Sequence, residues 1–239
     1  MKCIYCLAGD LKSTGDFPPG LGGMKVYQVS SGEISALISD VNLDHVVNNA
    51  QNATVHHEVV QATLELSASV IPCRFGTLVH NEEEILSLLR VRSAWLDACL
   101  TRIRGKVEVG VAAIVDGMTS PVLRRWETEG KGQSMTTGER YLLEKRQRYE
   151  VTKILRGQAE CLSRKLNEAT TPLWAEIKVE QRFIGYKLLL NLCYLIDRGK
   201  LSSFHYTYQQ FKKRWPGVKL LYTGPWPPYS FTEFSLFSS

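Results

Sequence analysis

The chain has 239 residues, enough for one large domain or two of ordinary size, and its 44% of hydrophobic residues excludes a wholly disordered protein. Its formal net charge of +5 is unevenly spread: residues 1–104 carry 8 basic and 11 acidic side chains, whereas residues 105–239 carry 21 and 13. This contrast favours a boundary near residue 104, and the basic half either meets an anionic partner or exposes a solvated helix face.

The N-terminal residues predict a strand. Residues 1–8 contain one lysine, and the chain turns polar at Gly9 and Asp10, so we expect no signal peptide. Residues 2–7 are predicted to form an edge strand, and a Gly/Pro-rich loop follows at residues 15–23. Residues 25–29 and 34–39 then form a hairpin, because the connecting Ser-Ser-Gly-Glu includes Gly32, which can take a positive φ.

A helical period begins at Asp44, which we predict to be the N-cap. One face of this helix carries Val46, Ala50, Ala53, His57, Val60, Leu64 and Ser67. His57 therefore lies on the buried face, as a core or interface histidine without a catalytic role, and His56 lies on another face.

A short strand at residues 69–73 leads into Arg74-Phe75-Gly76-Thr77. A second helix is predicted to begin near Asn81, because Glu82, Glu83 and Glu84 would lie in its first turn, where the helix dipole favours negative charge. Residues 1–104 are thus predicted to form a small sheet with two helices.

The second half shows a regular βαββαβ order, that of a ferredoxin-like domain. Thr136 and Glu139 form a capping box that opens a long helix to about residue 168, and Ser203 is the predicted cap of a second helix. The predicted strands are residues 106–115, 174–184, 186–196 and 218–222, with Gly185 joining the middle pair, and residues 118–135 are predicted to form a mobile loop. The fold class is therefore α+β, with domains at residues 1–104 and 105–239.

The last segment, Thr-Gly-Pro-Trp-Pro-Pro-Tyr-Ser-Phe at residues 223–231, contains three prolines. Proline lacks a backbone donor, so this segment is not an interior strand and is predicted to run extended across a surface. Its Trp226, Tyr229 and Phe231 then need cover, which either the chain itself or a partner supplies.

Motifs for catalysis or cofactor binding are absent from the sequence. There is no phosphate-binding glycine loop, nucleophile elbow or zincin motif, and the single C-x-x-C at Cys3 and Cys6 has no second pair to complete a zinc site. The most apolar run, residues 188–196, is about half as long as a membrane-spanning helix. We therefore expect no enzyme, cofactor, metal or lipid membrane contact, and we expect the cysteines to be reduced.

An RNA-recognition module is the alternative interpretation, because such modules share the βαββαβ order and a positive charge. Binding RNA on the sheet requires exposed aromatic residues on the central strands. The corresponding segments here read Val-Glu-Val-Gly-Val-Ala-Ala-Ile and Tyr-Lys-Leu-Leu-Leu-Asn-Leu-Cys. The sequence therefore favours a protein that does not bind nucleic acid.

Four separated segments resemble the GvpF/GvpL family of gas vesicle proteins. They are Thr-Gly-Pro-Trp-Pro-Pro-Tyr-Ser-Phe at 223–231, Ile-Pro-Cys-Arg-Phe-Gly-Thr at 71–77, Gly-Glu-Arg-Tyr-Leu-Leu-Glu-Lys at 138–145 and Val-Glu-Val-Gly-Val at 107–111. Cys73 stands where the family more often has an aliphatic residue. The resemblance marks Arg74, Phe75, Gly76, Trp226 and Tyr229 as candidate partner-contact or family-motif residues.

The resemblance implies a non-enzymatic role in the gas vesicle, a gas-filled organelle that gives buoyancy. The chain would be a minor structural component, an assembly or nucleation factor, or both. Its expected partners are the hydrophobic wall protein GvpA, whose aggregation it would limit, and other gas vesicle proteins. The implied location is the gas vesicle, within the cytoplasm.

Overall fold

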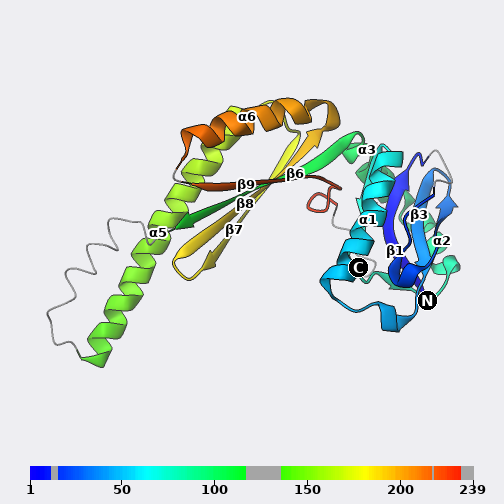
Figure 1. Ribbon diagram of the computed structural model, residues 1–239, viewed down its shortest axis with the longest axis horizontal. Helices are drawn as coiled ribbons and strands as arrows, with labels where there is room; N and C mark the ends of the chain where they lie inside the picture. The colour runs from blue at the N-terminus through cyan, green and yellow to red at the C-terminus, as the bar shows by residue number, and fades with distance from the viewer. Residues whose placement is uncertain (12–15, 117–135, 217, 233–239) are drawn as a thin grey trace. The chain divides into compact units, whose positions relative to one another are not determined.

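The computed structural model describes residues 1–11, 16–116, 136–216 and 218–232, and the chain divides into two compact units (Figure 1). The first unit contains Met1–Glu108, Leu195–Arg198 and the described residues from Pro225 onward. The second contains the described parts of Val109–Tyr194 and Gly199–Gly224. The proposed domain boundary near residue 104 stays a prediction.

The first unit is built on an antiparallel sheet of five strands: β1 (Lys2–Gly9), β2 (Val26–Ser31), β3 (Ile34–Asp40), β4 (Ser69–Pro72) and β5 (Leu78–Val79). The strand order is β2-β3-β1-β4, and β5 also pairs with β1. The prediction that residues 2–7 form an edge strand was therefore wrong. Residues Cys3 to Ala8 are all fully buried, and such a continuous apolar run is typical of an interior strand.

The hairpin of β2 and β3 is confirmed, and Gly32 takes a φ of 62° in its turn. Asp44 does not cap the following helix, α1 (Ala50–Leu66). Asn49 is the N-cap, with its side chain accepting a hydrogen bond from the Asn52 N–H at 2.8 Å, whereas Asp44 lies in a short 3-10 turn, η2 (Leu43–His45). A polar residue that satisfies the first free N–H groups sets the start of a helix, and Asn49 is better placed than Asp44 to do so.

The next helix begins where the sequence predicted. Asn81 caps α2 (Glu82–Val91) by accepting a hydrogen bond from the Glu84 N–H at 3.0 Å. The expected single helix is broken at Arg92, however, and a separate helix, α3 (Ser93–Ile103), follows it. The first unit thus contains α1, α2 and α3 in place of the two helices predicted.

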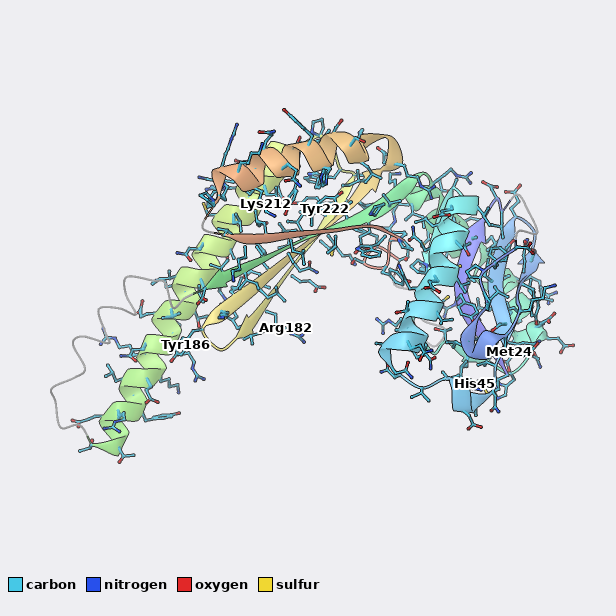
Figure 2. All side chains as sticks on the ribbon, viewed as in Figure 1. Met24, His45, Arg182, Tyr186, Lys212 and Tyr222 are labelled. Carbon is cyan, nitrogen blue, oxygen red and sulfur yellow. The ribbon has the colours of Figure 1, made fainter. Side chains whose placement is uncertain are left out.

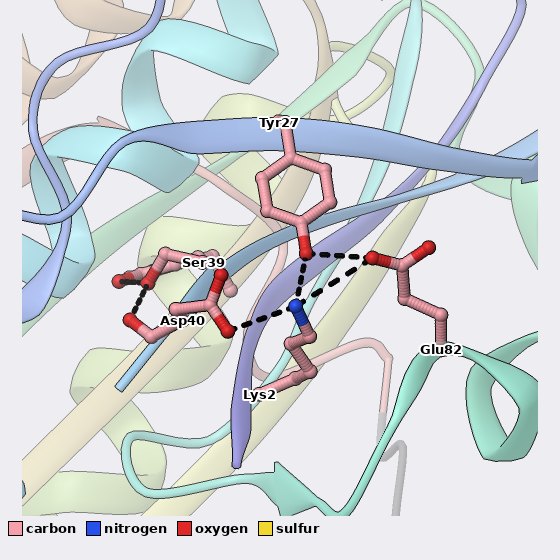
Figure 3. Close-up of polar contacts among 6 residues, drawn as sticks. Lys2, Tyr27, Ser39, Asp40 and Glu82 are labelled. Carbon is pink, nitrogen blue, oxygen red and sulfur yellow. Dashed lines mark hydrogen bonds and ion pairs between the residues drawn. The ribbon is translucent and has the colours of Figure 1, made fainter. Parts of the chain in front are cut away.

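A polar network ties the start of α2 to the sheet (Figure 3). The Lys2 ammonium group donates to Tyr27 Oη at 2.6 Å and lies 2.8 Å from Asp40 Oδ1. Tyr27 Oη in turn donates to Glu82 Oε1 at 2.8 Å, in the first turn of α2. The hydrogen bond to Asp40 is the main reason that the pKa of Lys2 is raised. One lysine therefore links strands β1, β2 and β3 to this helix.

The second sheet has the predicted βαββαβ order of elements: β6 (Lys106–Asp116), α5 (Thr137–Thr170), β7 (Glu176–Ile184), β8 (Lys187–Asp197), α6 (Leu201–Arg214) and β9 (Lys219–Trp226). The strands lie in the order β7-β8-β6-β9. The capping box of Thr136 and Glu139 is confirmed. Ser203 is not a cap, because α6 begins two residues earlier with Lys200 in the N-cap position. The predicted loop at residues 118–135 lies outside the described residues.

Helices α5 and α6 pack on the same face of the second sheet. The ring of Tyr222 on β9 packs 5.2 Å from that of Tyr208 on α6. Figure 2 shows Tyr222 beside α6. Arg156 of α5 lies 5.3 Å above the ring of Phe183 on β7. The strand residues that alternate with these point to the other face of the sheet, away from the helices. There a Cβ on Gly110 would lie 2.5 Å from Thr223 Oγ1, so a larger residue at this position would require the Thr223 side chain to move.

Among the described helices, none combines the length and the apolar character that a membrane crossing requires. The six cysteines carry free thiols, and Cys3, Cys6, Cys73 and Cys193 are buried.

Candidate interaction site

Two adjacent histidines on α1 contact the two segments that the sequence singled out. His56 is 3% exposed and its Nε2 lies 3.0 Å from the carbonyl oxygen of Cys73. Its ring meets that of Phe75 edge-on at 5.8 Å, so His56 fixes the segment at residues 73–75.

His57 contacts the C-terminal aromatic residues. Its ring centroid lies 5.1 Å from that of Trp226, in an edge-to-face arrangement, and Nδ1 lies 3.4 Å from Tyr229 Oη. His57 is therefore an interface histidine, as predicted, and it is half-buried.

The predicted faces of these two histidines were wrong, because His56 is the core residue. The buried positions of α1 are His56, Val59, Val60, Thr63 and Leu64. This stripe is shifted from the predicted one, which placed His57 on the buried face and His56 on another face. A pattern that mixes Ala, Thr and Val gives a weak helical period, so neighbouring faces are hard to separate from sequence.

The segment at residues 225–232, called the tail below, is held in the first unit by polar contacts. The buried carboxylate of Glu108 accepts hydrogen bonds from the Ser230 N–H and from Ser230 Oγ, both at 2.7 Å. Arg102 of α3 donates to the carbonyl oxygen of Phe231. These contacts fix the tail beside α3 and the start of β6.

Within the tail, buried and exposed side chains alternate. Phe231 is 3% exposed, and Pro227 and Pro228 are also buried. Trp226 and Tyr229 keep exposed fractions of 39% and 37%. The tail therefore packs through its prolines and Phe231, and it presents one tryptophan and one tyrosine to the surface.

The prediction that this segment is not an interior strand is confirmed. Strand β9 extends to Trp226, four residues beyond the predicted end at Tyr222, and it is the last strand in the sheet order. Pro225 is tolerated in β9 because an edge strand leaves alternate N–H positions unpaired. Beyond Trp226 the chain turns, with the Tyr229 N–H donating to Pro227 O at 2.7 Å and the Phe231 N–H donating to Pro228 O at 3.1 Å.

Arg74 lies in a turn at the end of β4. Its carbonyl oxygen accepts hydrogen bonds from the Thr77 N–H at 3.2 Å and from Thr77 Oγ1 at 2.7 Å. Gly76 takes a φ of 81° in this turn, a conformation that other residues adopt only with strain. The side chain of Arg74 is exposed, and it has no hydrogen bond or ion pair with any residue in the described ranges. Arg74 is thus available to a partner.

Burial favours the neutral forms of two histidines, a cysteine and a tyrosine in this region. It lowers the pKa of His56 and of His57, and it raises the pKa of the Cys6 thiol to about 12. Burial also raises the pKa of Tyr229 above its ordinary value. Neutral imidazoles and protonated thiols suit a packed surface more than acid–base or nucleophilic chemistry.

Sequence reasoning missed Glu108, Ser230 and Arg102. A glutamate inside the apolar strand Val-Glu-Val-Gly-Val was the one available signal, because a buried carboxylate needs hydrogen-bond donors. The described residues contain no cluster of three or more His, Cys, Asp or Glu side chains suited to a metal ion.

Comparisons with known proteins match nearly the whole chain to one family. Residues 2–233 match the model of the family described as gas vesicle synthesis protein GvpL/GvpF. Gas vesicle protein F1 of Halobacterium salinarum is 24% identical over 217 residues, which cover 90% of this chain and 84% of that protein. Gas vesicle protein L1 of the same organism is 21% identical over 258 residues, which cover 96% of this chain and 89% of that protein.

Two solved structures share the fold. The crystal structure of the gas vesicle protein GvpF from Anabaena superposes with a TM-score of 0.80 at 19% identity, covering 98% of this chain and 96% of that one. The crystal structure of GvpF from Microcystis aeruginosa superposes with a TM-score of 0.78 at 15% identity, covering 98% of this chain and 99% of that one. At such identities the likeness concerns the fold.

Proposed function

Since the chain belongs to the GvpL/GvpF family of gas vesicle synthesis proteins, we propose that it is a non-enzymatic minor component or assembly factor of the gas vesicle. In this proposal it binds the wall protein GvpA and other gas vesicle proteins, and it limits the aggregation of GvpA before or during nucleation. It acts in the cytoplasm, at the gas vesicle.

The exposed aromatic pair of the tail is the observation that supports a binding role. Trp226 and Tyr229 keep more than a third of their surface exposed while the tail backbone is fixed. Tryptophan and tyrosine are enriched at the energetic centres of protein interfaces. A prearranged aromatic surface also loses little conformational entropy when it binds.

A gas-facing wall explains why such a surface is useful. A subunit that is apolar towards gas exposes apolar surface and strand edges before assembly, and these features promote aggregation. A soluble partner that covers them keeps the subunit available. The aromatic pair and the exposed Arg74 side chain are our candidates for the covering surface.

The RNA-binding alternative lacks support on the sheet. Phe183, Tyr194 and Tyr222 of β7, β8 and β9 contact α5 or α6, through Arg156, Phe204 and Tyr208 respectively. The remaining strand aromatic, Trp226, packs on His57. Stacking of bases on the sheet needs aromatic residues on its uncovered face.

Co-expression with GvpA tests the proposal. We expect the two proteins to co-purify and the soluble fraction of GvpA to rise when the chain is present. A double variant, Trp226→Ser with Tyr229→Ser, should reduce both effects, and Tyr206→Ser, which removes an exposed tyrosine of α6, is the matched control. Equal recovery of soluble GvpA with and without the chain would refute the proposal, whereas retention on RNA at physiological salt would favour the alternative.

A further inference from the structure

A pocket of about 540 Å³ opens in the second unit, at the end of the sheet where β6 finishes and β9 begins. Its volume lies within the range of about 300 to 1,000 Å³ that is usual for small-molecule sites. Its walls include Ile114 of β6, Leu162 of α5 and Trp215, which follows α6. No residue of the tail or of the α1 histidine pair lines it, so the pocket is separate from the proposed GvpA surface.

The apolar wall of the pocket is held rigid on its tryptophan side. The Trp215 ring stacks on Phe211 at 5.8 Å with an interplanar angle of 21°. The Lys165 ammonium group lies 5.2 Å from the centroid of the same ring. Leu162 is 2% exposed and cannot move aside without disturbing the core. A ligand would meet a preformed apolar surface.

The polar residues of the pocket carry an excess of positive charge. Lys187 lies 3.6 Å from Asp116, so these two charges largely compensate each other. Lys219 also lines the pocket and is exposed, and its ammonium group makes no hydrogen bond or ion pair with the residues that the structure describes. Gln158 adds an amide group that can donate a hydrogen bond. These groups favour an anion over a cation or a neutral ligand.

We propose that this pocket binds a small amphipathic anion, with an aliphatic or aromatic body against Trp215 and Leu162 and a carboxylate at Lys219 and Gln158. The apolar body supplies most of the affinity through burial. The carboxylate fixes the orientation, because a charge-assisted hydrogen bond is directional. The site is independent of gas vesicle assembly and needs no partner protein.

Calorimetric titration of the full chain with decanoate, below its micelle-forming concentration, tests this inference. Decylammonium has the same tail with the opposite charge, and acetate has the charge without the tail. Decanoate should bind about tenfold or more tightly than either comparator. It should also raise the unfolding midpoint, with the shift growing roughly with the logarithm of its concentration above the Kd, as for a ligand of the folded state.

Three variants locate the binding. Lys219→Glu should weaken decanoate binding about fivefold or more. Loss of one partly exposed ion pair weakens binding about two- to fivefold, and this substitution also reverses the charge. Gln158→Trp should abolish binding, because it puts a much larger side chain into the pocket lining from an exposed position on α5. Lys145→Glu makes the same charge change on α5 outside the pocket and should leave the affinity unchanged.

The inference would be overturned by equal affinities for decanoate and decylammonium, by undetectable decanoate binding, or by unchanged affinity in Gln158→Trp. Unfolding midpoints of the three variants close to that of the parent chain confirm that each comparison is made on folded protein. None of these results depends on GvpA, so the inference and the proposed function succeed or fail separately.

Discussion

The Glu108 carboxylate accepts two hydrogen bonds from Ser230, one from the backbone N–H and one from the hydroxyl group, although the two residues lie 122 positions apart in the chain. Glu108→Ala should lower the free energy of unfolding by about 3 to 6 kcal/mol, because it removes two hydrogen bonds to a charged group and each contributes about 1.5 to 3 kcal/mol. Urea unfolding measures this change.

Ser230→Ala is the matched control, because it removes only the hydroxyl bond and keeps the N–H bond. It should cost about half as much as Glu108→Ala. Amide hydrogen exchange at residues 229–232 should quicken in Glu108→Ala. Exchange as slow as in the parent chain would show that this carboxylate does not hold the tail.

Substitutions of Trp226 and Phe231 compare the exposed part of the tail with its packed part. Phe231→Ala should cost about 3 to 5 kcal/mol, the usual loss for a buried aromatic residue. Trp226→Ala should cost about 1 to 2 kcal/mol, because 39% of the tryptophan is exposed and its main ring contact is with His57. Denaturant titration of both variants measures the two losses in the free energy of unfolding. A loss in Trp226→Ala as large as that in Phe231→Ala would contradict the exposed position of Trp226.

Trp226→Ala also separates stability from function. A protein that melts close to the parent but supports fewer gas vesicles would assign Trp226 to partner contact. Unaltered vesicle yield together with unaltered melting would leave this tryptophan without either role.

Arg74→Ala should change the free energy of unfolding by less than about 0.5 kcal/mol, as is usual for an exposed side chain. Gas vesicle yield in a host that lacks the native chain should nevertheless fall, because the guanidinium group is a candidate contact with a partner. Lys25→Ala, at another exposed basic residue of the first unit, should leave the yield unchanged. A large loss of stability in Arg74→Ala would instead give Arg74 a structural role.

The buried histidine makes stability depend on pH. Burial lowers the pKa of His56 in the folded protein, whereas an unfolded histidine protonates near about pH 6.5. Below that pH the unfolded state binds a proton that the folded state does not, so the free energy of unfolding falls as the pH drops and is restored above it. His57, whose pKa is also lowered mainly by burial, acts in the same direction.

His56→Gln should flatten this dependence, because its amide can donate to the carbonyl oxygen of Cys73 without titrating. Urea midpoints measured on either side of about pH 6.5 provide the comparison. His205→Gln, at an exposed histidine of α6, should keep the slope of the parent chain. If stability depends on pH equally in the parent chain and in His56→Gln, His56 is not the source of the pH dependence.

Local signals in the sequence predicted much of the fold. The capping box at Thr136 needs only residues three apart, and Gly185 joins two strands whose pairing follows from the turn. Strand order in the first sheet was less accessible, because β1 pairs with β3, β4 and β5 through contacts that no local pattern encodes.

The sequence identified several residues of the candidate site, but it did not predict how they are held in place. The proline spacing indicated an extended aromatic segment, but its fixing point, Glu108, is set by a contact over most of the chain length. The break at Arg92 and the register of His56 were also missed, since each depends on how a helix packs against a sheet and not on its own sequence.

The first unit is discontinuous along the chain, because the tail that completes it follows all of the second unit. During translation the ribosome therefore delivers β1 to α3 long before Ser230 and Phe231 reach them. Until then Glu108 has no Ser230 to bind, and the surface beneath Phe231 stays open to solvent or to chaperones. Completion of the aromatic surface is thereby delayed until the second unit has been synthesised.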